Sequence, residues 1–267
     1  MAQSSHVHDY SAETLMQPEP VVYSRALADI PNIVHGFTSA SGGASSGDFE
    51  SFNLSLRVGD DRASVLENQS RALASLGAAK HRLVTVKQVH GNAVVQVTQN
   101  AGRQIKADGL WTRDRKAAVA ILTADCVPIL LADRAGTTVC ALHAGWRGTK
   151  LKIVKVAIAA LAEVGVEPGE LCAAIGPAIG FEAFEIGAEV ATELRDALGA
   201  SALIEDRTEG KARADLQGLN HALLLEAGLK EAQIDILNHC TQTEPGYFSY
   251  RRDNGRTGRQ GAIIALT

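Results

Sequence analysis

Three apolar, β-rich segments follow one another closely near the middle of the chain, and they constrain the fold more than any other feature. They cover residues 117–124, 127–132 and 137–143. Each segment is too short to span a bilayer, and Asp125 separates the first from the second. Runs of this length and composition are typical of buried strands. We therefore predict three adjacent strands of a central sheet and no membrane-spanning segment.

Further strands and helices are predicted on both sides of these segments. Short β-rich runs bounded by turn-forming residues indicate strands at 34–37, 83–86, 93–97, 171–175 and 262–266. Apolar residues recur at intervals of three and four, which predicts helices at 62–76, 150–164, 188–198 and 216–227. We expect Asp61 to cap the first helix and Gly77 to end it. Because the strands come in groups with helices between the groups, the sequence favours an α+β or layered architecture over a doubly wound parallel sheet.

The composition allows one large domain preceded by a short extension. The chain has 267 residues, and 46% of them are hydrophobic, enough to bury a substantial core. No internal repeat or linker interrupts residues 21–267, which predicts a single domain. Residues 1–20 are polar, and we predict that they form a disordered N-terminal extension. Its two histidines, His6 and His8, are assigned no function, because a flexible segment does not hold metal ligands in a fixed geometry.

Charge and cysteine content limit the partners and the compartment. The formal net charge is −4 and both signs are spread along the chain, so no basic stripe favours binding to nucleic acid. The N-terminus lacks the basic start and apolar run of a signal peptide, which predicts a cytoplasmic protein. The 4 cysteines show no disulfide-framework spacing and are expected to remain thiols. No surface feature of the sequence predicts a protein partner or a membrane surface.

A separated trio, His90, Cys126 and His143, is the strongest indication of chemistry. Each lies at the predicted end of a strand. Two imidazoles and one thiolate suit zinc, and three protein ligands leave a fourth position for water or substrate, as in catalytic sites. A buried thiol is often only part of a core, and the spacing is not the paired-cysteine pattern of a zinc ribbon. From spacing alone, both readings stay open.

Arginines provide candidate anion sites. Arg147 follows His143 by only four residues, and a guanidinium can hold phosphate oxygens through two parallel hydrogen bonds. Residues 249–259 contain four arginines, including Arg251, in a turn-rich segment. That segment is either a solvated loop or a second anion site, and we favour Arg147. The glycine-rich stretch 41–47 lacks the lysine of a phosphate-binding P-loop.

Short segments along most of the chain resemble the successive signatures of the YfiH/YlmD/laccase-domain family. They read HGFT at 35–38, NL at 53–54, VGDD at 58–61, QVH at 88–90, ADG at 107–109, TADCVP at 123–128, HAGWRG at 143–148, GP at 176–177 and SYRR at 249–252. The resemblance implies a layered αββα sandwich of the YfiH-like type, with mixed sheets flanked by helices, and a single catalytic domain. It also implies zinc at His90, Cys126 and His143. The implied activity is phosphorolysis of adenosine, inosine and S-methyl-5'-thioadenosine, with adenosine deamination alongside. Two residues depart from the family's usual pattern, Ala40 in place of arginine and Arg57 in place of histidine.

The implied reactions suggest roles for further residues. Zinc lowers the pKa of a bound water, which would serve deamination. Phosphorolysis needs inorganic phosphate as co-substrate, and Arg147 or a C-terminal arginine such as Arg251 is expected to position it. Asp125 is expected either to protonate the departing base or, as we favour, to fix a histidine ring. Gln88 and Asn53 are expected to bind ribose or base, unless they only satisfy backbone groups.

Three other functions remain open at this point. A laccase of the usual multicopper type needs a mononuclear and a trinuclear copper centre, more histidine ligands than the 8 of this chain, two of which lie in the extension. Copper is therefore disfavoured. Cys126 activated by His143 could instead hydrolyse an amide or ester without metal. A purine-binding protein without catalytic activity is the last alternative.

Overall fold

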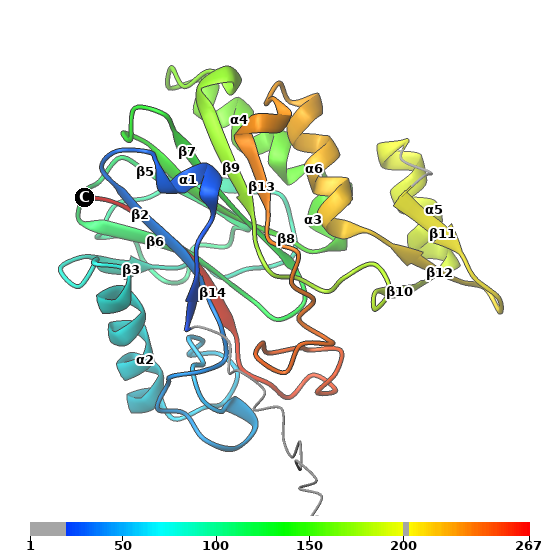
Figure 1. Ribbon diagram of the computed structural model, residues 1–267, viewed down its shortest axis with the longest axis horizontal. Helices are drawn as coiled ribbons and strands as arrows, with labels where there is room; N and C mark the ends of the chain where they lie inside the picture. The colour runs from blue at the N-terminus through cyan, green and yellow to red at the C-terminus, as the bar shows by residue number, and fades with distance from the viewer. Residues whose placement is uncertain (1–19, 200–202) are drawn as a thin grey trace, which may run out of the picture.

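Two large β-sheets face each other at the centre of the protein. The computed structural model describes residues 20–199 and 203–267 (Figure 1). The predicted extension with His6 and His8 therefore falls almost wholly outside the described residues. The first sheet has the order β1-β2-β14-β6-β3, formed by Val21–Val22, Ile33–Thr38, Gln260–Leu266, Ala117–Thr123 and Arg82–Val84. The second has the order β13-β9-β7-β8-β5-β4, formed by Ile234–Ile236, Leu171–Ile175, Val127–Asp133, Val139–Ala144, Gly109–Thr112 and Val94–Gln96. Both sheets are mixed, because each contains parallel and antiparallel pairs.

The three central segments do not lie side by side in one sheet, so that prediction was wrong. β6 belongs to the first sheet, whereas β7 and β8 are antiparallel neighbours in the second. The chain leaves β6 at Thr123 and enters β7 at Val127, with Asp125 between them at a φ of 86°. This left-handed backbone conformation is typical of tight turns. The turn at Asp125 redirects the chain from one sheet to the other. The pattern of apolar residues alone does not reveal this change of sheet.

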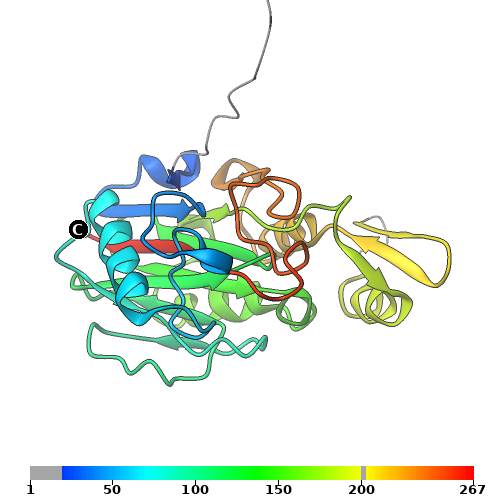
Figure 2. The same cartoon turned by 90° about the horizontal axis from the view of Figure 1, so that it is seen from below.

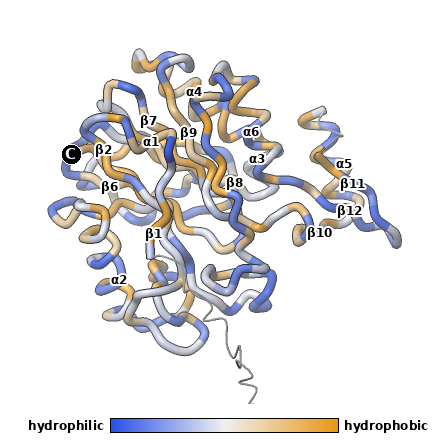
Figure 3. Tube along the Cα trace, in the orientation of Figure 1, coloured by the Kyte–Doolittle hydropathy of each residue, from blue (hydrophilic) through white to orange (hydrophobic). Residues whose placement is uncertain are grey.

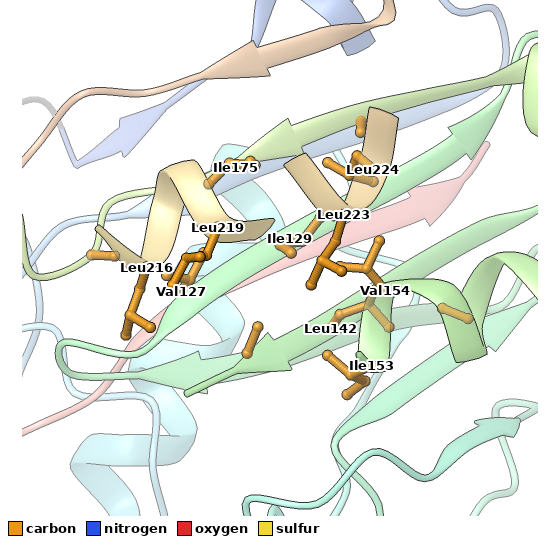
Figure 4. Packing of buried hydrophobic residues seen from close by; sticks show 14 of the residues in the cluster. Val127, Ile129, Leu142, Ile153, Val154, Ile175, Leu216, Leu219, Leu223 and Leu224 are labelled. Carbon is orange, nitrogen blue, oxygen red and sulfur yellow. The ribbon is translucent and has the colours of Figure 1, made fainter. Parts of the chain in front are cut away.

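Helices cover the outer face of each sheet and complete four layers. α2 (Arg62–Ser75) packs its apolar face on the first sheet, where Ala72 and Leu73 belong to the same buried cluster as Ile263. α4 (Ile153–Ala162) and α6 (Leu216–Glu226) cover the second sheet (Figure 4). A third cluster fills the space between the sheets, including Phe37, Ile121 and Leu130. Burial of these three apolar layers stabilises the fold. The αββα prediction is confirmed.

Two of the predicted helices differ in how closely they match the structure. The helix predicted at 62–76 begins and ends as expected. At its start Asp61 accepts a hydrogen bond from the Ser64 amide, and after its end Gly77 takes a φ of 73°. The helix predicted at 150–164 begins later, at Ile153, because Lys152 adopts a left-handed conformation. A separate short helix that was not predicted, α3 (Trp146–Lys150), precedes it. α3 begins three residues after His143, so the start of a helix lies next to the candidate site.

A smaller unit projects from one side of the protein. It consists of β10 (Glu185–Gly187), β11 (Ile204–Asp206) and β12 (Lys211–Ala214), with α5 (Ala188–Leu198) packed on them (Figures 1 and 2). The hairpin tip between β11 and β12 is hydrophilic, unlike the sheets (Figure 3). The remaining short helices are α1 (Arg25–Ala28), η1 (Gly47–Phe49), η2 (Pro168–Glu170) and η4 (Glu231–Gln233). Among the described residues, no helix is long and apolar enough to cross a membrane.

Candidate metal centre and cavity

The ends of strands from both sheets bring the trio together. His143 lies near the end of β8, and Cys126 immediately precedes β7, whose first residue, Val127, pairs with Ala144. His90 comes from the loop between β3 and β4. The ligand atoms of all three residues lie within 4.8 Å of one another, and Cys126 Sγ is 4.0 Å from His90 Nε2. Residues separated by up to 53 positions in the chain thus form one compact group of donors.

Asp108 orients two members of this trio. Its fully buried carboxylate lies 2.8 Å from His143 Nδ1 and accepts backbone hydrogen bonds from His90 at 2.9 Å and Gly91 at 2.7 Å. A third amide, that of Val89, also donates to it. Because Nδ1 of His143 is engaged, Nε2 is the nitrogen left for a ligand. A carboxylate behind a histidine in this way fixes the ring and strengthens it as a metal ligand.

The trio and Asp108 form an electrostatically coupled group. Burial raises the pKa of the Cys126 thiol, but hydrogen bonds and positive charge from His143 and His90 outweigh it and lower this pKa to about 6. Burial lowers the pKa of His143, yet Cys126 and Asp108 raise it more strongly. Burial also raises the pKa of Asp108, and the hydrogen bonds from His143 and Gly91 reverse this effect. The group therefore favours a thiolate, the form of cysteine that binds metal or acts as a nucleophile.

The donor set fits a zinc ion. Two imidazole nitrogens and a thiolate are preferred zinc ligands, and a trio leaves one tetrahedral position open. His143 and Cys126 are sheltered, whereas His90 is exposed, so the open side of the trio can face solvent or a ligand. Within residues 20–199 and 203–267, it is the one group of at least three potential metal ligands.

Gly145 allows the trio to close up. A Cβ atom at this position would lie 2.9 Å from Cys126 Sγ and 3.3 Å from His90 Cδ2. Gly145→Ala should therefore push the two ligands apart and lower the zinc affinity about tenfold or more, with the fold retained. Zinc competition with a chromophoric chelator measures this effect. Gly102→Ala is the control, because nothing lies within 4 Å of a Cβ there. Equal zinc affinities of the two variants would contradict the close packing.

Asp125 does not fix a histidine ring, contrary to our expectation, since Asp108 has that place. Its carboxylate accepts hydrogen bonds from Thr241 Oγ1 at 2.7 Å and from the Arg251 amide at 2.6 Å. Asp125 thus ties the C-terminal arginine segment to the turn that carries Cys126. It also lines the cavity described next, so a direct part in proton transfer remains a prediction.

A cavity of about 550 Å³ opens beside the trio. Six of the residues predicted for the site line it: Gln88, His90, Asp125, Cys126, His143 and Arg251. The Arg251 guanidinium lies over the Phe184 ring and donates to the Glu185 carbonyl. The side-chain amide of Gln88 makes two hydrogen bonds to the backbone of Leu122, so it satisfies backbone groups near the end of β6. The volume suits a ligand of nucleoside size.

Two predicted residues lie elsewhere. The exposed guanidinium of Arg147 lies 4.3 Å from the centre of the Trp146 ring and is not among the residues that line the cavity. Asn53 is fully buried, and its amide contacts Asp60, Ser55 and the Arg259 backbone. Asn53 therefore holds the backbone of Arg259 and does not line the cavity itself.

The cavity also contains residues that were not among the predicted site residues, although Arg57 was noted as a departure from the family pattern. Arg259 lies there half-buried, and the pKa of this arginine is lowered by burial and raised by the nearby charges of Cys126 and Asp125. Thr123 is buried, and its hydroxyl has no hydrogen-bond partner among the described residues. Arg57 and Arg103 come from two loops distant in sequence. Asp108 stood in the ADG motif and Arg259 in the arginine-rich segment 249–259, but only the fold shows what they contact.

A family model and several named proteins match most of this chain. A family model described as multi-copper polyphenol oxidoreductase laccase matches residues 34–267. A Deinococcus radiodurans protein named purine nucleoside phosphorylase is 39% identical over 242 residues, which cover 90% of this chain and 92% of that protein. Purine nucleoside phosphorylase YlmD of Bacillus subtilis is 34% identical, with 88% of each chain covered.

Solved structures give the same result. The crystal structure of Bacillus licheniformis hypothetical protein YfiH superimposes with a TM-score of 0.87 at 30% identity, and the match covers 93% of this chain and 97% of that one. Each of these matches extends over most of the chain. The chain therefore belongs to the multi-copper polyphenol oxidoreductase laccase family, which includes the YfiH and YlmD proteins.

Proposed function

We propose that residues 21–267 form a zinc-dependent purine nucleoside phosphorylase that acts on adenosine, inosine and S-methyl-5'-thioadenosine and also deaminates adenosine. One observation carries the proposal: a trio suited to zinc and several arginines line the same nucleoside-sized cavity. The names of the similar proteins support the phosphorylase activity.

Phosphorolysis exchanges one bond at the ribose. A phosphate oxygen forms a bond to C1′ while the bond from C1′ to the purine nitrogen breaks, and its electron pair leaves with the base, which then takes up a proton. A bound zinc would supply a Lewis acid with one open position. Arg251 and Arg259 carry positive charge at the same cavity, where they can orient the phosphate. Asp125 lines the same cavity, next to Cys126 in the chain and hydrogen-bonded to the Arg251 amide, and we propose that it supplies the proton to the base.

Aromatic and apolar surfaces are available for the base. Phe184 and the exposed ring of Tyr250 line the cavity, together with Ile179. Purines stack favourably on aromatic rings. The two rings also hold the guanidinium groups of Arg251 and Arg259 nearby, which joins the surface for the base to the proposed phosphate contacts.

Thr123 offers a direct test of where the substrate binds. Thr123 lines the cavity and its buried hydroxyl has no partner in the described part of the chain, so we propose that it hydrogen bonds to ribose or base when the substrate is bound. Thr123→Val, which keeps the shape, should raise the KM for nucleoside about three- to tenfold without lowering the melting temperature, because the protein loses no internal hydrogen bond. Thr123→Ser is the control and should keep the wild-type KM. An unchanged KM in the valine variant would exclude this contact.

Chromatographic detection of free base tests the activity itself. Zinc-loaded protein is incubated with adenosine or inosine, with and without phosphate. We expect adenine or hypoxanthine only when phosphate is present, and inosine from adenosine in either case. If no base is released and no inosine forms, the assignment to purine nucleosides fails.

The geometry also favours a second candidate, a metal-free cysteine hydrolase. Asp108, His143 and Cys126 form a series in which a carboxylate orients a histidine beside a thiol of lowered pKa. Alkylation distinguishes the two functions. Iodoacetamide should modify Cys126 at once if the thiolate is a free nucleophile, but only after chelation if the thiolate holds zinc.

The copper chemistry in the family's description finds no support in the ligands. Multicopper oxidation requires several metal centres, and the described residues, outside 1–19 and 200–202, contain a single candidate group. Two histidines and a cysteine resemble a single electron-transfer copper site, which could not by itself reduce dioxygen to water. A copper content above the zinc content in protein purified without added metal would overturn this conclusion.

A further inference from the structure

Four arginines that none of the proposed steps requires lie near one another, and two of them line the cavity. Arg57 and Arg103 line it, and Arg62 and Arg82 lie close enough to Arg103 to act on its charge. They come from the loop before α2, the loop after β4, the first turn of α2 and the first residue of β3. The fold therefore assembles this arginine cluster, made up of Arg57, Arg62, Arg82 and Arg103, from separate segments.

The cluster lacks compensating negative charge. Across the described parts of the chain, no carboxylate lies within ion-pair distance of any of the four guanidinium groups. Arg57 donates to the backbone carbonyl of Arg103, which brings the two residues together instead of separating them. The nearby carboxylates are already engaged, since Asp60 accepts from Ser45 and Asn53 and Asp61 caps α2.

This arrangement is unfavourable for an empty cavity. Burial and the charges of Arg62, Arg82 and Arg57 lower the pKa of Arg103. The N-terminus of α2, where Arg62 lies, adds partial positive charge. An anion with two negative charges would relieve the repulsion, and guanidinium groups recognise the oxygens of phosphate through paired hydrogen bonds.

We propose that Arg57 and Arg103 bind a phosphate group in the cavity, with Arg62 and Arg82 reinforcing the positive potential. The phosphate is either the 5′-phosphate of a nucleoside monophosphate or the inorganic co-substrate. In the second case Arg57 and Arg103 would hold the co-substrate in place of Arg251 and Arg259. The inference rests on the proposed function for its choice of ligands. The geometry that carries it, an unpaired cationic cluster on a cavity wall, is independent of turnover.

Titration calorimetry on the full-length, zinc-loaded protein tests the site without requiring catalysis. The ligands are inorganic phosphate, adenosine and adenosine 5′-monophosphate. The variants are Arg57→Gln and Arg103→Gln. Arg71→Gln is the control, because it removes one charge from an exposed arginine of α2 that pairs with Glu67. We expect the two cluster variants to weaken phosphate-group binding about tenfold or more, with melting temperatures no lower than that of the control, since like-charge repulsion is relieved.

The ligands distinguish the two sources of phosphate. If the site holds the co-substrate, inorganic phosphate binds to the wild type and loses affinity in Arg103→Gln, while the monophosphate binds no better than adenosine. If it holds a 5′-phosphate, the monophosphate binds more tightly than adenosine, and Arg103→Gln removes the difference. The proposal is overturned if the wild type binds neither anion or if both cluster variants match Arg71→Gln. If the cluster variants weaken anion binding but the protein releases no base from nucleosides, the proposed function fails and the proposed phosphate site is retained.

Discussion

Cys126→Ser should remove both the bound zinc and the phosphorolysis. A serine hydroxyl is a poor zinc ligand compared with the thiolate, and two histidines alone do not hold the ion firmly. We expect the zinc content to fall from about one equivalent to near zero and kcat/KM to fall by more than about 100-fold. This loss exceeds the roughly 10- to 100-fold effect of replacing a residue that only hydrogen-bonds to a metal ligand. Metal analysis and the base-release assay measure the two effects on the same sample.

Cys240→Ser is the matched control for this variant. Cys240 is also a partly buried thiol, and its sulfur accepts a hydrogen bond from the Gly180 amide, but it does not belong to the trio. This control should keep full zinc content and activity. If Cys126→Ser retained zinc and activity, the trio would not be the metal centre. If it lost activity while keeping zinc, a nucleophilic role for Cys126 would move ahead.

Asp108→Asn should produce the second largest effect. The carboxylate accepts from three backbone amides and engages His143 Nδ1, whereas an asparagine would turn an NH2 group toward some of these donors. We expect zinc affinity to fall about 10- to 100-fold. The unfolding free energy should also fall by about 1–3 kcal/mol, because buried amides lose their acceptor. Zinc competition and urea denaturation measure these changes.

Asp114→Asn separates the two effects. Asp114 also accepts hydrogen bonds from backbone amides, those of Gln99 and Lys116, but it does not contact the trio. This variant should lose some stability and keep its zinc affinity. Equal zinc affinity in Asp108→Asn and Asp114→Asn would show that Asp108 supports only the loop and not the metal site.

The sequence predicted the secondary structure of the core better than its assembly. Helix 188–198 and strand 171–175 agree with the structure residue for residue. The helix has apolar residues at helical spacing on its buried face, and the strand is a short, fully buried apolar run followed by the turn-forming Gly176-Pro177. The division of 117–143 between two sheets could not be predicted, since both faces of β6 and β7 are buried and both read as continuous apolar runs. The short strands of the projecting unit escaped prediction because three or four residues carry little periodic signal.

The candidate site shows the same limit. His90, Cys126 and His143 were identifiable because two imidazoles and a thiolate suit zinc and because their segments match the family resemblance. Asp108 was not given its role, because a buried aspartate and a surface aspartate look alike in a sequence. Asp125 is closer to His143 along the chain, but in the fold it is Asp108 that contacts the His143 ring. Arg57 and Arg103 are 46 residues apart, and only the folded loops bring them together.

The most direct test of the central claim is the ratio of ribose 1-phosphate to hypoxanthine formed from inosine, measured on chelator-treated protein before and after one equivalent of zinc is restored. We expect almost no product from the treated protein and equal amounts of the two products once zinc is present. Hypoxanthine without ribose 1-phosphate, or equal product formation with and without zinc, would contradict zinc-dependent phosphorolysis at the trio.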